Sequence, residues 1–189
     1  MDQTLFLWVS VVIIFSLGTL AHFLYDLSHE NKILGLFTAV NESTWEHVKI
    51  AITPTLLWSL IDGFFYGEGP NYFTAKLTSL TILAFFIPLV FYSYTRLSKK
   101  PILPVDILTF LAAIILAQLA FFAIINLPDF PFISSYLSAI GTFIFFGAYM
   151  TLTLMPLKQI IFKDPTNGQY GFRAHRNLFK SLKKNPTKK

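Results

Sequence analysis

Five long apolar stretches constrain the fold of this chain more than any other feature of its sequence. A helix needs about 20 mainly apolar residues to cross a bilayer. Stretches of about that length occupy residues 5–25, 44–66, 73–94, 105–127 and 132–155. Across the chain 54% of the residues are hydrophobic and 13% are charged, which is typical of a membrane protein. The sequence therefore predicts an all-α polytopic membrane bundle of about five transmembrane helices, formed by residues 1–156.

The residues around these stretches narrow the prediction further. The first stretch has no basic segment before it and no small-residue cleavage site after it, so we expect a retained first helix. The later stretches are separated by helix breakers, among them Gly69-Pro70, Pro101 and Pro128. The chain contains no cysteine, which excludes disulfides and thiolate metal sites.

The positions of Lys and Arg predict the orientation of the bundle. Lys32 and Lys49 flank the segment after the first stretch, three basic residues lie within residues 96–100, and nine follow the fifth stretch. The other side has only Lys76. The positive-inside rule therefore predicts an N-terminus outside, a C-terminus in the cytoplasm, and a multi-pass protein of the plasma membrane.

Residues 157–189 are predicted to form a basic amphipathic cytoplasmic tail. Phe172, His175 and Leu182 fall on one face of a helix, and basic residues occupy much of the rest. Such a helix is attracted to anionic lipid. Nucleic acid is a poor partner, because the basic run is short and lies beside the membrane. We expect His175 on the surface, although the tail can also fold back over the cytoplasmic face.

Small residues mark one face of the fifth stretch. They are Ser134, Ser138, Gly141 and Ala148. Small residues let helices approach each other closely. This face is therefore expected to pack inside the bundle, and a homodimer seam is the alternative.

Polar residues inside the apolar stretches need partners. Asp62 and Lys76 lie near the outer ends of neighbouring stretches, so they are expected to pair and neutralise each other. Gln118 lies in the middle of a stretch and is expected to hydrogen-bond to another helix. Pro54 and Pro88 are expected to kink their helices.

Ionisable residues gather between His22 and Lys49, beside the ends of the first two stretches. His22, Asp26 and His29 are spaced i, i+4, i+7, so they form one stripe on a helix. Farther along, Ser43 and Glu46 fit a capping box, in which each side chain bonds the other residue's backbone N–H. A cap at Asn41 is the alternative.

Antiparallel packing of the first two helices would bring these groups together at the cytoplasmic interface. Imidazole and carboxylate ligands suit zinc, manganese or iron. We predict His22, Asp26 and His47 as metal ligands, and Glu42 and Glu46 as catalytic acid–base groups. The expected function is then metal-assisted chemistry, with a divalent metal such as zinc, on a lipid-like substrate.

Two other functions fit the same residues. Histidines and carboxylates near a membrane boundary also pass protons or ions, so a small proton- or ion-coupled transporter or channel is the first alternative. The second is a non-catalytic membrane scaffold, in which the motif only fixes the start of a helix. The sequence does not decide whether the chain is an enzyme.

The segment from Asn41 to Lys49, Asn-Glu-Ser-Thr-Trp-Glu-His-Val-Lys, resembles a motif of a family of small, uncharacterised prokaryotic integral membrane proteins. In that family an Asn-Glu-Ser-x-Trp-Glu-His-x-Lys stretch follows the first span. The resemblance extends over most of the chain and implies a common fold, but it brings no activity. The family has small or polar residues after the aspartate, where this chain has Leu27-Ser28-His29, so His29 is a weaker candidate ligand than His22 or His47.

Overall fold

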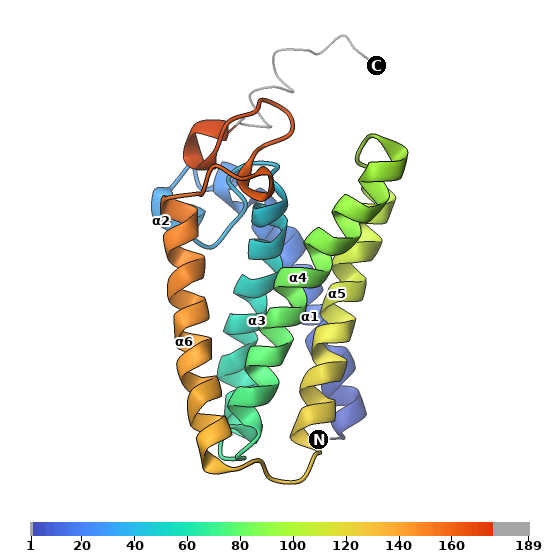
Figure 1. Ribbon diagram of the computed structural model, residues 1–189, viewed down its shortest axis with the longest axis vertical. Coiled ribbons are helices and arrows are strands. Elements are labelled where there is room, and N and C mark those ends of the chain that lie inside the picture. The colour runs from blue at the N-terminus through green and yellow to red at the C-terminus, as the bar shows by residue number, and fades with distance from the viewer. Residues whose placement is uncertain (1, 176–189) are drawn as a thin grey trace.

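The computed structural model describes residues 2–175, which fold into an all-α bundle (Figure 1). Five of its helices are long and apolar enough to cross a membrane. They are α1 (Gln3–Leu27), α3 (Thr44–Tyr66), α4 (Tyr72–Ser98), α5 (Leu103–Ile125) and α6 (Phe132–Leu154). A further helix, α2 (Lys32–Gly35), forms one turn after α1, and two 3₁₀ turns, η1 (Ile160–Phe162) and η2 (Gly171–Ala174), follow α6. The described residues contain no strand, and the predicted fold class is confirmed.

Each long helix begins and ends within four residues of its predicted bounds. The turns between the helices are also joined to one another through Asn71. Its side-chain amide donates to the carbonyl of Leu127 at 2.9 Å, and its carbonyl oxygen accepts from the N–H of Phe130 at 2.8 Å. The turn between α3 and α4 is thereby fastened to the turn between α5 and α6.

Helix α4 lies at the centre of the bundle, where it packs against α3, α5 and α6. Helix α1 packs against α3 and α5. Large apolar side chains fill the space between them, among them Phe6, Ile14, Leu80, Ile114 and Phe121, each at most 1% exposed. The antiparallel pairing of α1 with α3 places the end of one beside the start of the other.

Helix α6 is the least buried of the five. Two of its small residues contact α4, as expected for a face that packs inside the bundle. Ser138 hydrogen-bonds Thr74 at 3.0 Å, and a methyl group on Gly141 would lie 2.9 Å from Leu77. Ala148 is exposed. A homodimer stays a prediction.

Two predicted polar contacts inside the bundle are confirmed. The Lys76 ammonium lies 2.5 Å from the Asp62 carboxylate, which also accepts from the Tyr72 hydroxyl at 2.8 Å. The Ser10 hydroxyl donates to Gln118 at 3.0 Å, which joins α1 to α5. Each polar group therefore has the partner that an apolar environment requires.

Residues 155–175 fold back over the ends of α1 and α3 (Figure 1), and we call them the C-terminal cap. They consist of turns and two 3₁₀ helices. The ring of Phe162 packs on Trp45 with centroids 5.1 Å apart, and Phe172 packs on Tyr25 at 5.8 Å. The predicted amphipathic helix falls mainly on residues 176–189, which lie outside the described residues. His175 differs from its predicted surface position, because its side chain is only 13% exposed.

Candidate metal centre

The segment between α1 and α3 is folded tightly, although it contains only one helical turn. His29 and Glu30 adopt left-handed backbone conformations that turn the chain at the end of α1. Asn31 then caps α2, since its side-chain oxygen accepts from the N–H groups of Ile33 and Leu34. The following residues, 38–41, are buried against the bundle.

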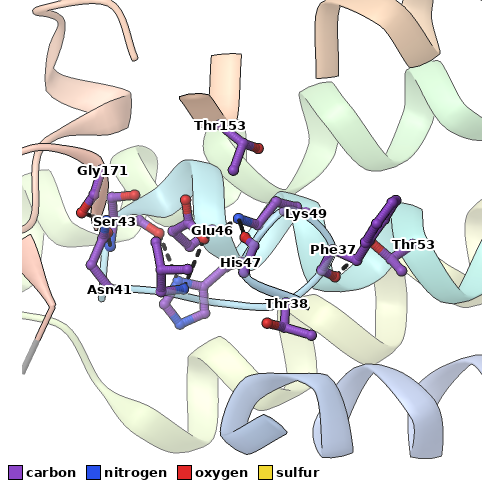
Figure 2. A network of polar contacts seen from close by, with 12 residues as sticks. Phe37, Thr38, Asn41, Ser43, Glu46, His47, Lys49, Thr53, Thr153 and Gly171 are labelled. Atoms are coloured by element: carbon purple, nitrogen blue, oxygen red, sulfur yellow. Dashed lines mark hydrogen bonds and ion pairs between the residues drawn. The ribbon is translucent and has the colours of Figure 1, made fainter. Parts of the chain in front are cut away.

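A buried ion pair fixes this segment to α3 (Figure 2). Glu46 and Lys49 lie 2.6 Å apart, with side chains 3% and 0% exposed. The Glu46 carboxylate also accepts from the N–H of Val40 at 3.0 Å, and Lys49 donates to the carbonyl of Gly35 at 2.9 Å. One pair therefore satisfies two backbone groups that have no helical partner.

The predicted capping box at Ser43 does not form. Ser43 occupies the position before α3, but its side chain makes no capping hydrogen bond. Its N–H donates instead to the side chain of Asn41 at 2.8 Å, and Glu46 reaches Val40. The prediction failed because Lys49, one turn farther along α3, attracts the Glu46 carboxylate into the interior.

Three predicted site residues meet at the cap-side end of α1 and α3. They are His22 from α1, Glu42 from the connecting segment, and His47 from α3. One ligand atom from each lies within 4.8 Å of the other two. The Nε2 atoms of His22 and His47 are each 4.0 Å from a different oxygen of Glu42, and the two imidazole centroids are 5.5 Å apart.

The ring of His47 is oriented for coordination. Its Nδ1 lies 3.0 Å from the carbonyl oxygen of Ser43. A carbonyl only accepts, so Nδ1 must be the protonated nitrogen, and the lone pair of a neutral imidazole then lies on Nε2, toward Glu42. A backbone carbonyl on the far nitrogen is the usual partner of a metal-binding histidine.

One ring nitrogen of His22, Nδ1, is buried without a hydrogen bond to any of the described residues. The side chain is 24% exposed overall, against 35% for His47 and 40% for Glu42. The cluster is thus open on the Glu42 side and closed on the His22 side.

The C-terminal cap holds Glu42 in place. The N–H of Glu42 donates to the buried Asp164 carboxylate at 3.2 Å. The neighbouring Asn41 donates from its side chain to the carbonyl of Gly171 at 3.0 Å (Figure 2). The backbone of Glu42 is therefore fixed, while its side chain stays half exposed beside the two histidines.

Asp26 and Glu46 lie apart from this group. The Asp26 carboxylate is 3.0 Å from Nε2 of His175, whose Nδ1 lies 2.9 Å from the carbonyl of Val40. Both nitrogens of His175 thus face oxygen acceptors. Glu46 is held by Lys49, as described. The five predicted residues therefore belong to three neighbouring groups at one end of the bundle. These are the cluster of His22, Glu42 and His47, the Asp26–His175 pair and the Glu46–Lys49 pair.

Sequence reasoning overlooked Asp164 as a site residue. Its only local signal is the turn sequence Asp164-Pro165, which indicates a turn and no contact with Glu42. The sequence predicts His175 on the surface and predicts its partner Asp26 as a metal ligand, so the contact between them was missed as well. Both contacts join segments more than 120 residues apart, so spacing along the chain could not reveal them.

Comparison with known proteins identifies one related group. Residues 1–172 match the model of a family of unknown function, DUF6512. Searches of curated proteins and of solved structures found no significant match.

Proposed function

This chain belongs to that family of unknown function, whose description assigns no activity, and we propose from the geometry of its own residues that it binds a divalent transition metal, best zinc, through His22, Glu42 and His47. The observation that supports the proposal is the convergence of two imidazoles and one carboxylate from three separate segments. Hard alkaline-earth ions are disfavoured, because they prefer oxygen ligands only.

The distances fit a zinc ion after small side-chain rotations. Ligand atoms around tetrahedral zinc lie about 3.3 Å apart, given bonds of about 2.0–2.1 Å. The Nε2–oxygen separations here are 4.0 Å. All three ligand atoms lie within 4.8 Å of one another, so closing the gaps by about 1.5 Å or less brings them to coordination distance, and the half-exposed Glu42 has the most room to move.

Three protein ligands leave one coordination position open, as in catalytic zinc sites. A metal in such a site polarises a carbonyl or phosphoryl oxygen and makes a bound water a better nucleophile. We therefore propose hydrolysis of an ester or phosphoester bond in a lipid-like substrate. Water adds to the carbonyl or phosphoryl centre, and the leaving alcohol takes the proton.

The remaining predicted residues then have supporting roles. We propose Glu42 as a ligand, not as the base, because it is equidistant from the two histidines. Asp26 positions the C-terminal cap through His175, and Glu46 holds the connecting segment through Lys49. A bound metal would itself make the water easier to deprotonate, and the partly exposed cluster would let that proton pass to solvent.

We also propose that this end of the bundle faces the cytoplasm of a prokaryotic plasma membrane, as the positive-inside rule predicts. It holds Lys32 and the C-terminal cap, with its excess of basic residues. The Asn-Glu-Ser-Thr-Trp-Glu-His segment is proposed as the hallmark of the family, since it supplies Glu42, His47 and the Glu46 anchor.

Metal content of the full-length protein tests the proposal. After purification without chelator and exposure to excess zinc, we expect about one zinc per chain, measured by mass spectrometry of the digested sample. His22→Ala and His47→Ala should each lower it to below about one fifth. The matched control is His29→Asn, an exposed histidine outside the cluster whose left-handed backbone asparagine tolerates. Equal zinc in all four proteins would refute the proposal.

A further inference from the structure

A groove opens along the membrane-facing side of α4, between this helix and the C-terminal cap. It is a shallow, open groove with a volume of about 550 Å³. Ala84, Phe85, Pro88 and Leu89 form its apolar part, while Arg96 and Ile161 line it at the cap end. It contains none of the three proposed metal ligands.

Pro88 explains why the groove exists. Proline has no N–H, so the carbonyl of Ala84, one turn earlier, lacks its usual helical donor and the helix bends. Figure 1 shows that the upper ends of α4 and α5 lean away from α6 and from the C-terminal cap above it. The groove lies where this divergence exposes the side of α4.

The groove is apolar at one end and positively charged at the other, which matches the acyl chains and headgroups of an anionic lipid monolayer. Phe85, Leu89, Ser93 and Arg96 follow one another at helical spacing and are all exposed, so they share one face of α4. From Phe85 to Arg96 the helix rises about 16 Å. That length matches half the hydrocarbon core, which is about 15 Å. An acyl chain beside Phe85 would thus have its headgroup level with Arg96.

The chemistry at the cap end selects an anion. Arg96 has no ion-pair partner among the described residues, and its guanidinium can bind two phosphate oxygens at once. The Ser93 hydroxyl lies one turn below it on the same face.

A packed helix is a poor occupant of the groove, because close helix contacts favour small residues. Phe85 and Leu89 are bulky, and they are 71% and 66% exposed.

We propose that this groove binds one anionic phospholipid of the surrounding bilayer. One acyl chain lies along Phe85, Pro88 and Leu89, and the phosphate binds Arg96. The inference goes beyond the proposed metal chemistry and does not depend on it, since the groove and the metal ligands share no residue.

Native mass spectrometry of the delipidated full-length protein tests this inference. The protein is titrated with phosphatidylglycerol or phosphatidylcholine, and the dissociation constant of the first bound lipid is measured. We expect phosphatidylglycerol to bind more tightly. Arg96→Gln should weaken it about fivefold or more and remove the preference. The matched control is Lys100→Gln, an exposed cation four residues farther along, just after the end of α4, that does not line the groove, and its effect should stay below twofold.

A second variant tests the apolar part without changing charge. Ala84→Leu places a larger side chain in the groove and should weaken both lipids by at least threefold. Equal weakening by Arg96→Gln and Lys100→Gln would show only general attraction to a basic surface, and would overturn the proposal. So would unchanged binding in Ala84→Leu, displacement of the lipid by inorganic phosphate, or a dimer that Ala84→Leu converts to monomer.

Discussion

The backbone N–H of Glu42 donates a hydrogen bond to the Asp164 carboxylate, 3.2 Å away and 122 residues farther along the chain. Asp164 therefore positions a proposed metal ligand from outside the ligand shell. Replacing Asp164 by Asn removes the charge on the acceptor while keeping its shape. We expect zinc affinity to fall about tenfold, as is typical when such supporting contacts are lost.

Competition with a chromogenic chelator measures this change in dissociation constant. The matched control is Asp129→Asn, an exposed aspartate in the turn between α5 and α6, at the opposite end of the bundle. It should leave zinc affinity unchanged. Equal affinities for the wild type and Asp164→Asn would show that the C-terminal cap does not support the site.

Breaking the Glu46–Lys49 pair should lower the free energy of unfolding substantially. Glu46→Gln or Lys49→Met leaves the partner charge buried and unpaired, which costs about 3–5 kcal/mol in comparable cases. The double variant should lose clearly less than the sum of the two single variants, because it leaves no uncompensated charge. Reversible unfolding in detergent gives the free energies, and strict additivity would contradict the interpretation.

Gly18 sets the spacing between α1 and α3 one turn before His22. A methyl group on Gly18 would lie 2.7 Å from the carbonyl oxygen of Ile50 and 2.6 Å from the Phe110 ring. Gly18→Ala should therefore push α1 away from α3, destabilise the protein by about 1–3 kcal/mol, and weaken zinc binding. The control Gly147→Ala, where a methyl group meets nothing within 4 Å, should change neither quantity. A wild-type zinc affinity in Gly18→Ala would show that helix spacing does not govern the site.

The sequence predicted the helices well because their signal is local. Apolar length and the breakers around residues 67–71 and 128–131 set the five long helices without reference to tertiary contacts. The antiparallel pairing of α1 with α3 was also predicted, since consecutive membrane-spanning helices joined on one side run in opposite directions. His22, Glu42 and His47 were accordingly predicted among the site residues.

Competition between partners could not be predicted from the sequence. Glu46 fits a capping box by spacing, yet the buried Lys49 attracts its carboxylate. Asp26 fits a stripe with His22, yet His175 lies 3.0 Å from it. Both outcomes depend on which charged groups end up buried together, and the C-terminal cap contributes groups from the far end of the chain.

Zinc binding should weaken as the pH falls, because protons compete for the imidazole nitrogens that hold the metal. Each of the two histidine ligands competes with a proton, so the affinity should fall more steeply with decreasing pH than it would with one histidine. In His47→Ala only one histidine remains, so the slope should halve. Zinc titrations between pH 5.5 and 8 measure the slope, and a pH-independent affinity would exclude histidine ligands.

X-ray absorption at the zinc edge tests the central claim most directly. The full-length protein loaded with one zinc per chain should show a four-coordinate ion with nitrogen and oxygen neighbours at about 2.0–2.1 Å. It should also show the outer-shell scattering of two imidazole rings, and the smaller amount of zinc that His22→Ala still retains should show one ring fewer. A six-coordinate spectrum with oxygen neighbours only, or one unchanged by His22→Ala, would contradict a metal centre built by His22, Glu42 and His47.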